Sequence, residues 1–214
     1  MTTQASLYEK FINDPSWSSK IDRSGQASLE SRWFSDPERR ILLARLCVLS
    51  VPGKFFAETL LIYPCTEADY PIFGSEFIQT RRGYFGATDF HPFSPQSDLS
   101  GSVFASEPDR VVEKSAHYDL DTYFSSKLWH KKSETDFRSE YNDVCGRRLN
   151  TYLADLSARS VCSTCDGVKF SDFDAYMAEN DPAHGILRSY YGPDFARDYI
   201  EKYLFPHNLF RSVL

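Results

Sequence analysis

Three β-rich runs follow one another in the middle of the chain with only short links between them: KFFAETLLIYP at residues 54–64, YPIFGSEFIQT at 70–80 and YFGATDFHP at 84–92. Links of this length cannot hold a crossover connection, so neighbouring strands must run antiparallel as a meander. Gly83 can adopt the positive φ that the second turn needs. In such a sheet, the segment from Gly74 to Glu76 lies beside the strand that carries Asp89.

The segments around this meander are mixed in character. A short amphipathic helix is expected at residues 1–14, a polar loop or short elements at 15–37, and a long loop at 93–112. The apolar run 41–51 fits a helix or a buried strand equally. Helical patterns occupy 119–132, 134–160, 171–180 with Ser171 as N-cap, and a stretch opening at Gly192-Pro193. We therefore expect an α+β fold in one domain (1–214), with helices packed on an antiparallel sheet.

The composition limits the possible functions. A chain of 214 residues can form one domain, and its 17 Phe, 13 Tyr and 3 Trp can both fill a core and line a cavity. The net charge of −6 argues against a general binder of nucleic acid or anionic membranes. No apolar run approaches the ~20 residues of a membrane span. The N-terminus resembles neither a secretion signal nor an organelle import leader, so we expect a cytoplasmic protein.

Metal and cofactor motifs are weak or missing. Five cysteines form no evident disulfide framework, and the pair in CSTC (162–165) has no second pair to complete a metal site, so ordinary thiols are favoured. The five histidines are scattered, and the chain has no glycine motif for dinucleotides or phosphates. For an enzyme, these absences favour acid–base chemistry on a bound ligand.

Two carboxylates stand out from their surroundings. Asp89 lies on an apolar strand, where Asp is disfavoured, and is either a strand-end residue turned toward water or an acid held in a pocket. Asp181 precedes Pro182, a pattern typical of a helix N-cap, and is either that cap or a second acid. His91 and His184 each lie within three residues of one of these acids and only weakly suggest a proton relay. Local sequence leaves these alternatives open.

Three stretches together resemble the ferredoxin-dependent bilin reductase family. They are LIYPCTEADYPIFGSEF, the following TDFHP, and FSDFDAYMAENDPAHGILRSYYGPDFARDYIEKYLF. In the family, the strand after a P-[IL]-F-G-x-[DE] segment carries an active-site Asp, matched here by Asp89. A second Asp in a C-terminal block is matched by Asp181. The resemblance covers residues 55–92 and 170–206, and is closest to the phage-type enzymes that make phycoerythrobilin.

The resemblance implies a three-layer α/β/α sandwich with biliverdin IXα bound between the sheet and the C-terminal helices. Such enzymes hold no metal and no organic cofactor. They take single electrons from reduced ferredoxin and pass through substrate radicals. Asp89 would protonate the bilin from the sheet side and Asp181 from the helix side. A monomer in the cytoplasm of a phototroph or a phage-infected host is implied.

The resemblance also leads to predicted contacts. Gly74, Phe90, His91 and Asn180 are expected to touch the bilin. Its propionates need cations or hydroxyls, and the candidates are Ser94, Ser126, Lys127 and Arg188. Ferredoxin would dock on a basic patch, although a solvated surface is the usual role of such residues: Arg81, Arg82, Lys127, Lys131, Lys132, Arg147 and Arg148.

One departure from the family bears on the product. The catalytic His of the phycocyanobilin-forming branch falls at or beside Gly74, between Phe73 and Ser75, so no His is available at that position. This favours a four-electron reduction of biliverdin to phycoerythrobilin through 15,16-dihydrobiliverdin. The alternatives are a sibling enzyme that gives phycocyanobilin, phytochromobilin or only dihydrobiliverdin, a non-catalytic bilin carrier, and a structural interaction protein.

Overall fold

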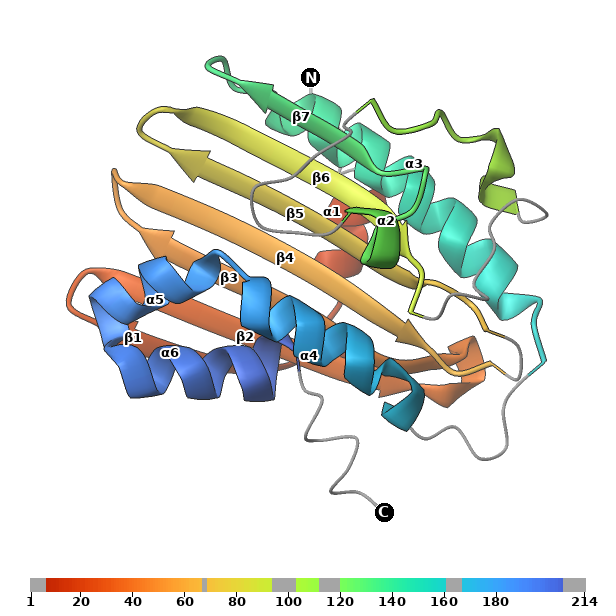
Figure 1. Cartoon of the computed structure of the whole chain (residues 1–214), viewed down its shortest axis with the longest axis horizontal. Coiled ribbons are helices and arrows are strands. Elements are labelled where there is room, and N and C mark those ends of the chain that lie inside the picture. The colour runs from red at the N-terminus through yellow and green to blue at the C-terminus, as the bar shows by residue number, and fades with distance from the viewer. Residues whose placement is uncertain (1–6, 67–68, 94–102, 112–119, 161–166, 206–214) are drawn as a thin grey trace.

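A seven-stranded antiparallel sheet crosses the molecule, and its strands neighbour one another in chain order (Figure 1). The computed structural model describes residues 7–66, 69–93, 103–111, 120–160 and 167–205. The strands are β1 (Ser18–Ser24), β2 (Ala27–Asp36), β3 (Ile41–Val51), β4 (Phe55–Pro64), β5 (Ile72–Thr80), β6 (Gly83–His91) and β7 (Trp129–Ser133).

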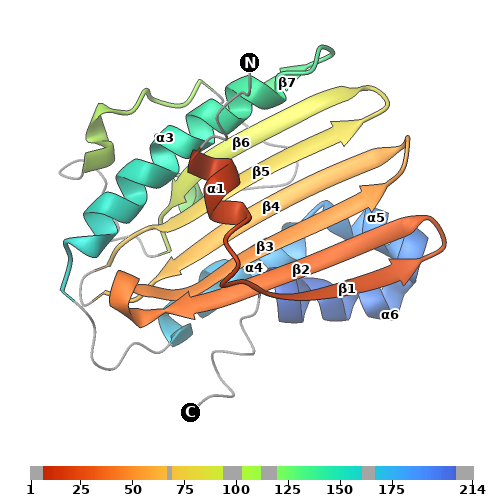
Figure 2. The same cartoon turned by 180° about the vertical axis from the view of Figure 1, so that it is seen from behind.

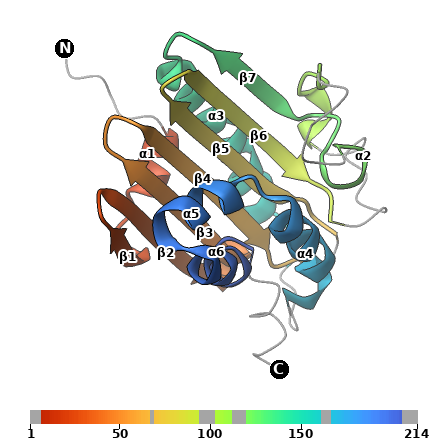
Figure 3. The same ribbon diagram turned by 60° about the vertical axis from the view of Figure 1, so that its left-hand side comes forward.

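Helices cover both faces of this sheet. The α1 helix (Leu7–Ile12) and the long α3 helix (Arg138–Ser157) lie on one face (Figure 2). The other face carries α4 (Ser171–Asn180), α5 (Ala183–Tyr191) and α6 (Pro193–Tyr199), which continues as a π-helical turn at Ile200–Leu204. The short α2 helix (Leu120–Tyr123) lies between β6 and β7 in the chain. Figure 3 shows the sheet between the two helical layers, which confirms the predicted α/β/α sandwich.

The alternation of side chains along the strands builds a core on each face. Successive residues of a strand point to opposite sides of the sheet. On β4, Leu60 and Ile62 therefore enter the core under α3, while Leu61 and Tyr63 enter the core under α4 and α6. The same alternation on β5 and β6 decides which residues can reach a ligand on the α4–α6 side.

The meander predicted from the sequence is confirmed. The three predicted strands are β4, β5 and β6, and Gly83 turns between the last two with φ of 138°. Residues 41–51, which fitted either a helix or a strand, form β3, buried between β2 and β4. Six of the residues predicted as a helix at 1–14 form α1.

Two segments differ from the prediction. Residues 15–37 were expected to form a polar loop or short elements, but they include β1 and all of β2, because neighbouring strands supply hydrogen-bonding partners for these polar residues. Among the described residues of 119–132, only α2 is helical, and Trp129–Ser133 pairs with β6 as the edge strand β7. The helix predicted at 171–180 is confirmed as α4, but the prediction of Ser171 as its N-cap is wrong. Ser171 is the first helical residue and buried, and no side chain caps α4.

Candidate functional site

A cavity of about 480 Å³ lies between the sheet and the α4–α6 layer, and we call it the central cavity. Alternate residues of β4, β5, β6 and β7 face it, as the pleat requires, and Ser75 and Thr88 also border it. Its sheet wall includes Thr59, Leu61, Gly74, Glu76, Ile78, Phe85, Ala87, Asp89, His91, His130 and Lys132. Its other wall comprises Leu120, Phe124, Leu128, Met177, Asp181, Pro182 and Phe205.

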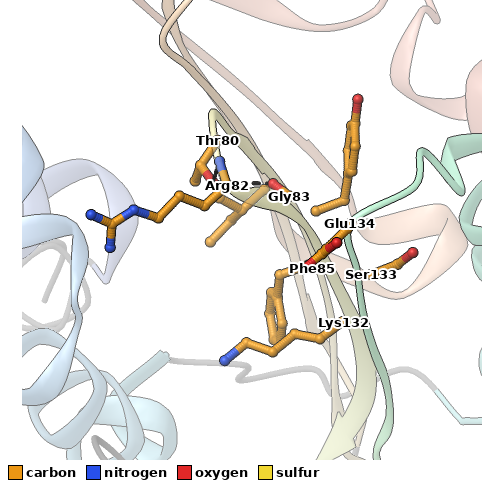
Figure 4. Close-up of a pocket in the computed structure, with 9 residues that line it drawn as sticks. Thr80, Arg82, Gly83, Phe85, Lys132, Ser133 and Glu134 are labelled. Atoms are coloured by element: carbon orange, nitrogen blue, oxygen red, sulfur yellow. Dashed lines mark hydrogen bonds between the residues drawn. The ribbon is translucent and has the colours of Figure 1, made fainter.

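Two further spaces adjoin the central cavity. A side chamber of about 210 Å³ extends toward α5 and α6 and shares Thr59, Glu76, Ile78, Asp181 and Pro182 with it. An edge groove at the β5–β6 turn shares Ile78, Phe85 and Lys132. In Figure 4, the side chains of Arg82, Phe85 and Lys132 project from the same side of the sheet in this groove. The site therefore consists of a central cavity that adjoins a side chamber and an edge groove, and the edge groove carries the cations Arg82 and Lys132.

Asp89 is buried in the sheet wall of the central cavity, with only 1% of its surface exposed. The backbone N–H of Ser125 donates to its Oδ2 at 2.8 Å, and the Ser125 hydroxyl donates to Oδ1. On the neighbouring strand, Gly74 pairs directly with Asp89, as the meander predicted. The alternative of a strand-end carboxylate turned toward water is therefore wrong. Asp89 is an acid oriented by two hydrogen bonds at the cavity wall.

His91 stands beside Asp89 on the same face of β6. Its Nδ1 is 3.0 Å from the carbonyl oxygen of Tyr123 and 3.5 Å from Oδ2 of Asp89. Because a carbonyl oxygen can only accept, this contact places a hydrogen on Nδ1. The opposite nitrogen, Nε2, lies over Gly74, where an added Cβ would come within 2.3 Å of it. Glycine at 74 therefore makes room for the imidazole ring.

This placement corrects one argument from the sequence. No histidine occupies position 74, but the His91 ring fills the space above it from the next strand. The sequence did not reveal that a histidine of the neighbouring strand occupies this space. The lack of a histidine at Gly74 consequently carries less weight for the choice of product than the sequence suggested.

Asp181 faces the cavity from the helical side, at the junction of α4 and α5. Its Oδ1 accepts the backbone N–H of Ala183 at 2.6 Å, in the manner of a capping carboxylate at the start of α5. The two readings of Asp181 from the sequence are thus compatible: the carboxyl supports the helix start and also lines the ligand space. Asp89 and Asp181 belong to opposite walls of one cavity.

Glu76 is a third acid of the cavity that the sequence reading did not select. It lies two residues after Gly74 on the same face of β5, opposite Thr59 on one neighbouring strand and Ala87 on the other. Burial, and then the negative charge of Asp181, raise the pKa of Glu76 from its usual 4.5 to about 8, although a hydrogen bond with Thr59 opposes the rise. The acidic position of the P-[IL]-F-G-x-[DE] segment was the signal that could have found it.

Several predicted contact residues lie away from the cavity. Phe90 faces α3, because it neighbours Asp89 on a strand. Its ring stacks on Phe104 at 3.9 Å and lies 4.4 Å from the Arg148 guanidinium. The Asn180 amide donates to the carbonyl of Tyr176 at 2.8 Å. Ser126 and Arg188 are exposed outside the cavity lining, and Ser94 lies outside the described residues.

Most of the predicted basic patch is engaged with acids or buried. Lys127 pairs with Asp109 at 2.8 Å, Lys131 pairs with Glu140, and Arg147 pairs with Glu107 at 2.7 Å. Arg148 is only 1% exposed and cannot present its charge to a partner. What remains near the cavity is the cationic end of the edge groove, with Arg82 and Lys132.

Metal-binding clusters and membrane-spanning helices are both missing from the described part of the chain. Nowhere in it do three or more His, Cys, Asp or Glu side chains come together in a way that could hold a metal ion. The CSTC pair at 162–165 lies outside the described residues. Among the described helices, none combines the length and apolar character needed to cross a membrane.

The known proteins with similar sequences belong to one enzyme family. The family model described as ferredoxin-dependent bilin reductase matches residues 19–206. A 15,16-dihydrobiliverdin:ferredoxin oxidoreductase of Prochlorococcus marinus is 46% identical over 163 residues, which cover 68% of this chain and 67% of the relative. A phycoerythrobilin:ferredoxin oxidoreductase of Prochlorococcus marinus subsp. pastoris is 26% identical over 200 residues, 82% of this chain and 76% of the relative.

A solved structure has the same fold. Phytochromobilin synthase from tomato, determined in complex with biliverdin, aligns with a TM-score of 0.66 at 18% identity. The alignment covers 89% of this chain and 74% of the tomato chain. At this identity, the likeness establishes the three-layer architecture.

Proposed function

Because the chain belongs to the ferredoxin-dependent bilin reductase family, we propose that it reduces biliverdin IXα to phycoerythrobilin through 15,16-dihydrobiliverdin. It is an oxidoreductase that acts on bilins with electrons from ferredoxin. The observation that carries the specific proposal is the pair of acids, Asp89 and Asp181, on opposite walls of one cavity. Such a pair can protonate two different positions of a flat ligand placed between them.

The chemistry explains why acids are needed. Adding an electron to a conjugated tetrapyrrole raises its basicity, so a nearby acid must deliver a proton to trap the charge. The complete reaction consumes four electrons from reduced ferredoxin and four protons, which reach the bilin through side chains of the cavity. Asp89 donates first, from the sheet side. Ser125 fixes the direction of its carboxyl through both oxygens.

Asp181 donates a proton from the helix side during the second reduction, whose electrons come from ferredoxin. Its position is set by the start of α5, because Oδ1 is held by the Ala183 N–H. His91 assists Asp89, since its Nδ1 lies 3.5 Å from that carboxyl and its Nε2 faces Gly74 at the cavity wall. The propionates extend toward Lys132 and Arg82 at the edge groove, in place of the predicted Lys127 and Arg188.

A second candidate function has its own support. The relative with 46% identity is named a 15,16-dihydrobiliverdin:ferredoxin oxidoreductase. Under this alternative, the chain carries out a single two-electron reduction and ends at, or begins from, 15,16-dihydrobiliverdin. If the reaction ends at 15,16-dihydrobiliverdin, Asp181 has no second reduction to protonate; if it begins there, Asp89 has no first reduction to protonate.

Anaerobic turnover tests the proposal. The purified protein is supplied with ferredoxin, ferredoxin reductase and NADPH, and either biliverdin IXα or 15,16-dihydrobiliverdin is the substrate. Absorbance and product chromatography should show biliverdin passing through a transient dihydrobiliverdin to phycoerythrobilin. Accumulation of dihydrobiliverdin alone would favour the second candidate, and a phycocyanobilin or phytochromobilin product would place the chain in a sibling branch. A stable complex with neither substrate reduced would contradict catalysis and indicate a carrier.

A further inference from the structure

We propose that Arg45 is a positioning residue that holds the end of the helical layer against β3, so that Phe205 stays in the wall of the central cavity. Arg45 is not one of the described residues that line this cavity, and it acts on the ligand through Phe205. In this way it sets how tightly a bilin is held. The inference rests on the proposed function, because it takes a bilin as the occupant of the cavity.

Arg45 faces the helical layer from the middle of β3. Along this strand, Leu46 enters the core under α3 and Cys47 enters the core under α4 and α6, so Arg45 shares the face of Cys47. Its paired residue on β4 is Leu61, which lines the central cavity. Only 6% of the Arg45 surface is exposed. A cation therefore lies within an apolar core, next to the ligand space.

The Arg45 guanidinium binds the end of the π-helical turn that follows α6. Its Nη1 donates to two backbone oxygens, that of Lys202 at 3.1 Å and that of Tyr203. Both carbonyls belong to the turn Ile200–Leu204. The last carbonyls of a helix have no partners within it and carry the negative end of its dipole, so a cation stabilises them. Arg45 thus joins the end of this turn to the middle of the sheet.

The residues at the end of the turn form part of the walls of the ligand space. Leu204 lines the side chamber and Phe205 lines the central cavity, and both are buried. The backbone N–H of Phe205 donates to the Ile200 carbonyl at 2.7 Å, so the place of its ring depends on how the turn closes. If the turn moved away from β3, this wall would recede and offer less apolar surface to a bilin.

A buried arginine is a costly way to fill this part of the core. Burial lowers the pKa of Arg45, and its Nε has no hydrogen-bond partner among the described residues. Within the described part of the chain, no carboxylate forms an ion pair with it. Since desolvating a cation costs free energy, stability alone favours an apolar side chain of similar volume here. What the guanidinium adds is one definite position for the turn, because it binds two of its carbonyls.

Arg32 makes the same kind of contact on the opposite face of the sheet. It lies on β2, and its Nη1 donates at 2.8 Å to the carbonyl of Ile12, the last residue of α1. No described residue of α1 lines the central cavity. The sheet therefore holds two helix ends with arginines, and of these two contacts only the one from Arg45 supports a cavity wall. Arg32 is the matched control.

The first test is the dissociation constant (Kd) for biliverdin IXα, measured by absorbance titration without ferredoxin. R45M, which keeps the volume and removes the donors, should raise Kd by about tenfold, and R32M should leave it unchanged. F205A should also raise Kd. The double variant R45M/F205A should bind no more weakly than F205A alone, because both changes remove the same wall. R45K keeps a cation that can bind the carbonyls and should recover part of the affinity.

Two further measurements separate positioning from a general loss of stability. In turnover with ferredoxin, R45M should raise KM for the bilin with little change in kcat, since Asp89 and Asp181 stay in place. Amide hydrogen exchange at Phe205 should be faster in R45M than in wild type, even without bilin. R32M should show neither effect. Thermal denaturation shows whether each variant is folded, and R45Q replaces R45M in the same comparison if R45M is not.

An R45M variant that binds biliverdin as tightly as wild type would overturn the inference. So would losses that multiply in R45M/F205A, because Arg45 would then act independently of Phe205. A wild-type protein that binds no bilin would instead refute the proposed function. In that case the exchange measurement still decides whether Arg45 holds the turn: faster exchange in R45M supports the contact, and unchanged exchange contradicts it.

Discussion

The two faces of the sheet are made from the same strands and each packs a hydrophobic core, but the α4–α6 face also encloses a cavity. On the α3 face, aromatic rings fill the space: Phe73, Phe77, Phe90, Tyr141 and Tyr152 are each at most 2% exposed. On the opposite face, the residues adjacent in sequence to Phe73, Phe77 and Phe90 line a cavity. They are Gly74, Glu76 and Asp89.

Charge is treated differently on the two faces as well. The α3 face neutralises Glu58 with Arg138 at 3.1 Å. The cavity face instead collects Glu76, Asp89 and Asp181 around one space. Since adjacent residues of a strand face opposite ways, the packed face can hold the strands in place while the other face carries reactive acids. This division predicts that neighbouring substitutions on β6 will have unrelated effects.

The largest effect is expected from D89N on the cavity face. The asparagine side chain retains the size of the aspartate and an oxygen for the Ser125 N–H, but it cannot donate an acidic proton. We expect bilin binding to persist, while the rate of the first reduction falls by about 10²- to 10⁴-fold. Stopped-flow absorbance should show a long-lived reduced bilin species.

A matched control for D89N is D174N. Asp174, in α4, is also fully buried, but its carboxylate accepts a hydrogen bond from the Tyr63 hydroxyl at 2.7 Å and lies outside the cavity lining. D174N should keep bilin turnover close to that of wild type. Equal losses in both variants, or normal turnover by D89N, would show that Asp89 has only a structural role.

The next effect is expected from F90A, one residue further along β6 on the packed face. Removing this ring leaves a cavity among Phe104, Tyr152 and the Arg148 guanidinium. We expect the free energy of unfolding, measured by urea denaturation, to fall by about 3–5 kcal/mol. The rate of the folded variant should change little.

The companion substitution is F85A on the same strand, where the ring lines the central cavity. F85A should weaken bilin binding and cost less unfolding free energy than F90A, because Phe85 is only partly buried. The opposite order, with F90A impairing binding and F85A impairing stability, would break the division between the faces.

A smaller effect is expected from D181N. The asparagine amide oxygen can still accept the Ala183 N–H, so the start of α5 should persist. The first reduction should proceed, and the second should slow by roughly 10- to 100-fold because its acid is missing. Product chromatography should then show 15,16-dihydrobiliverdin accumulating. An unchanged yield of phycoerythrobilin from this variant would refute the role assigned to Asp181.

The fold could be predicted where the sequence determines it locally. The strands β4–β6 are rich in β-formers and joined by short links, so their type and pairing followed directly. The edge strands escaped prediction because their residues are polar and exposed: β1 has four exposed residues in succession, and β7 reads WHKKS. Their strand conformation depends on the hydrogen bonds that β2 and β6 offer, which no local pattern reveals.

The site was predictable to a similar extent. An Asp among apolar strand residues and the Asp-Pro junction both led to acids of the cavity wall. Phe90 was a misjudgement that strand alternation could have prevented, since a neighbour of Asp89 must face the other way. Lys127 could not be judged from the sequence, because its pairing with Asp109 depends on tertiary structure. The contact of His91 with Gly74 joins two strands and appears only in the folded sheet.

The proposed function requires a bilin on the cavity face of the sheet, between Asp89 and Asp181. A crystal structure of the wild-type protein with biliverdin IXα, prepared without reductant, tests it most directly. We expect the tetrapyrrole in the central cavity, with the Asp89 carboxyl against one side, Asp181 against the other and the propionates toward Lys132. A bilin bound elsewhere, with both carboxyls out of its reach, would show that Asp89 and Asp181 do not protonate it.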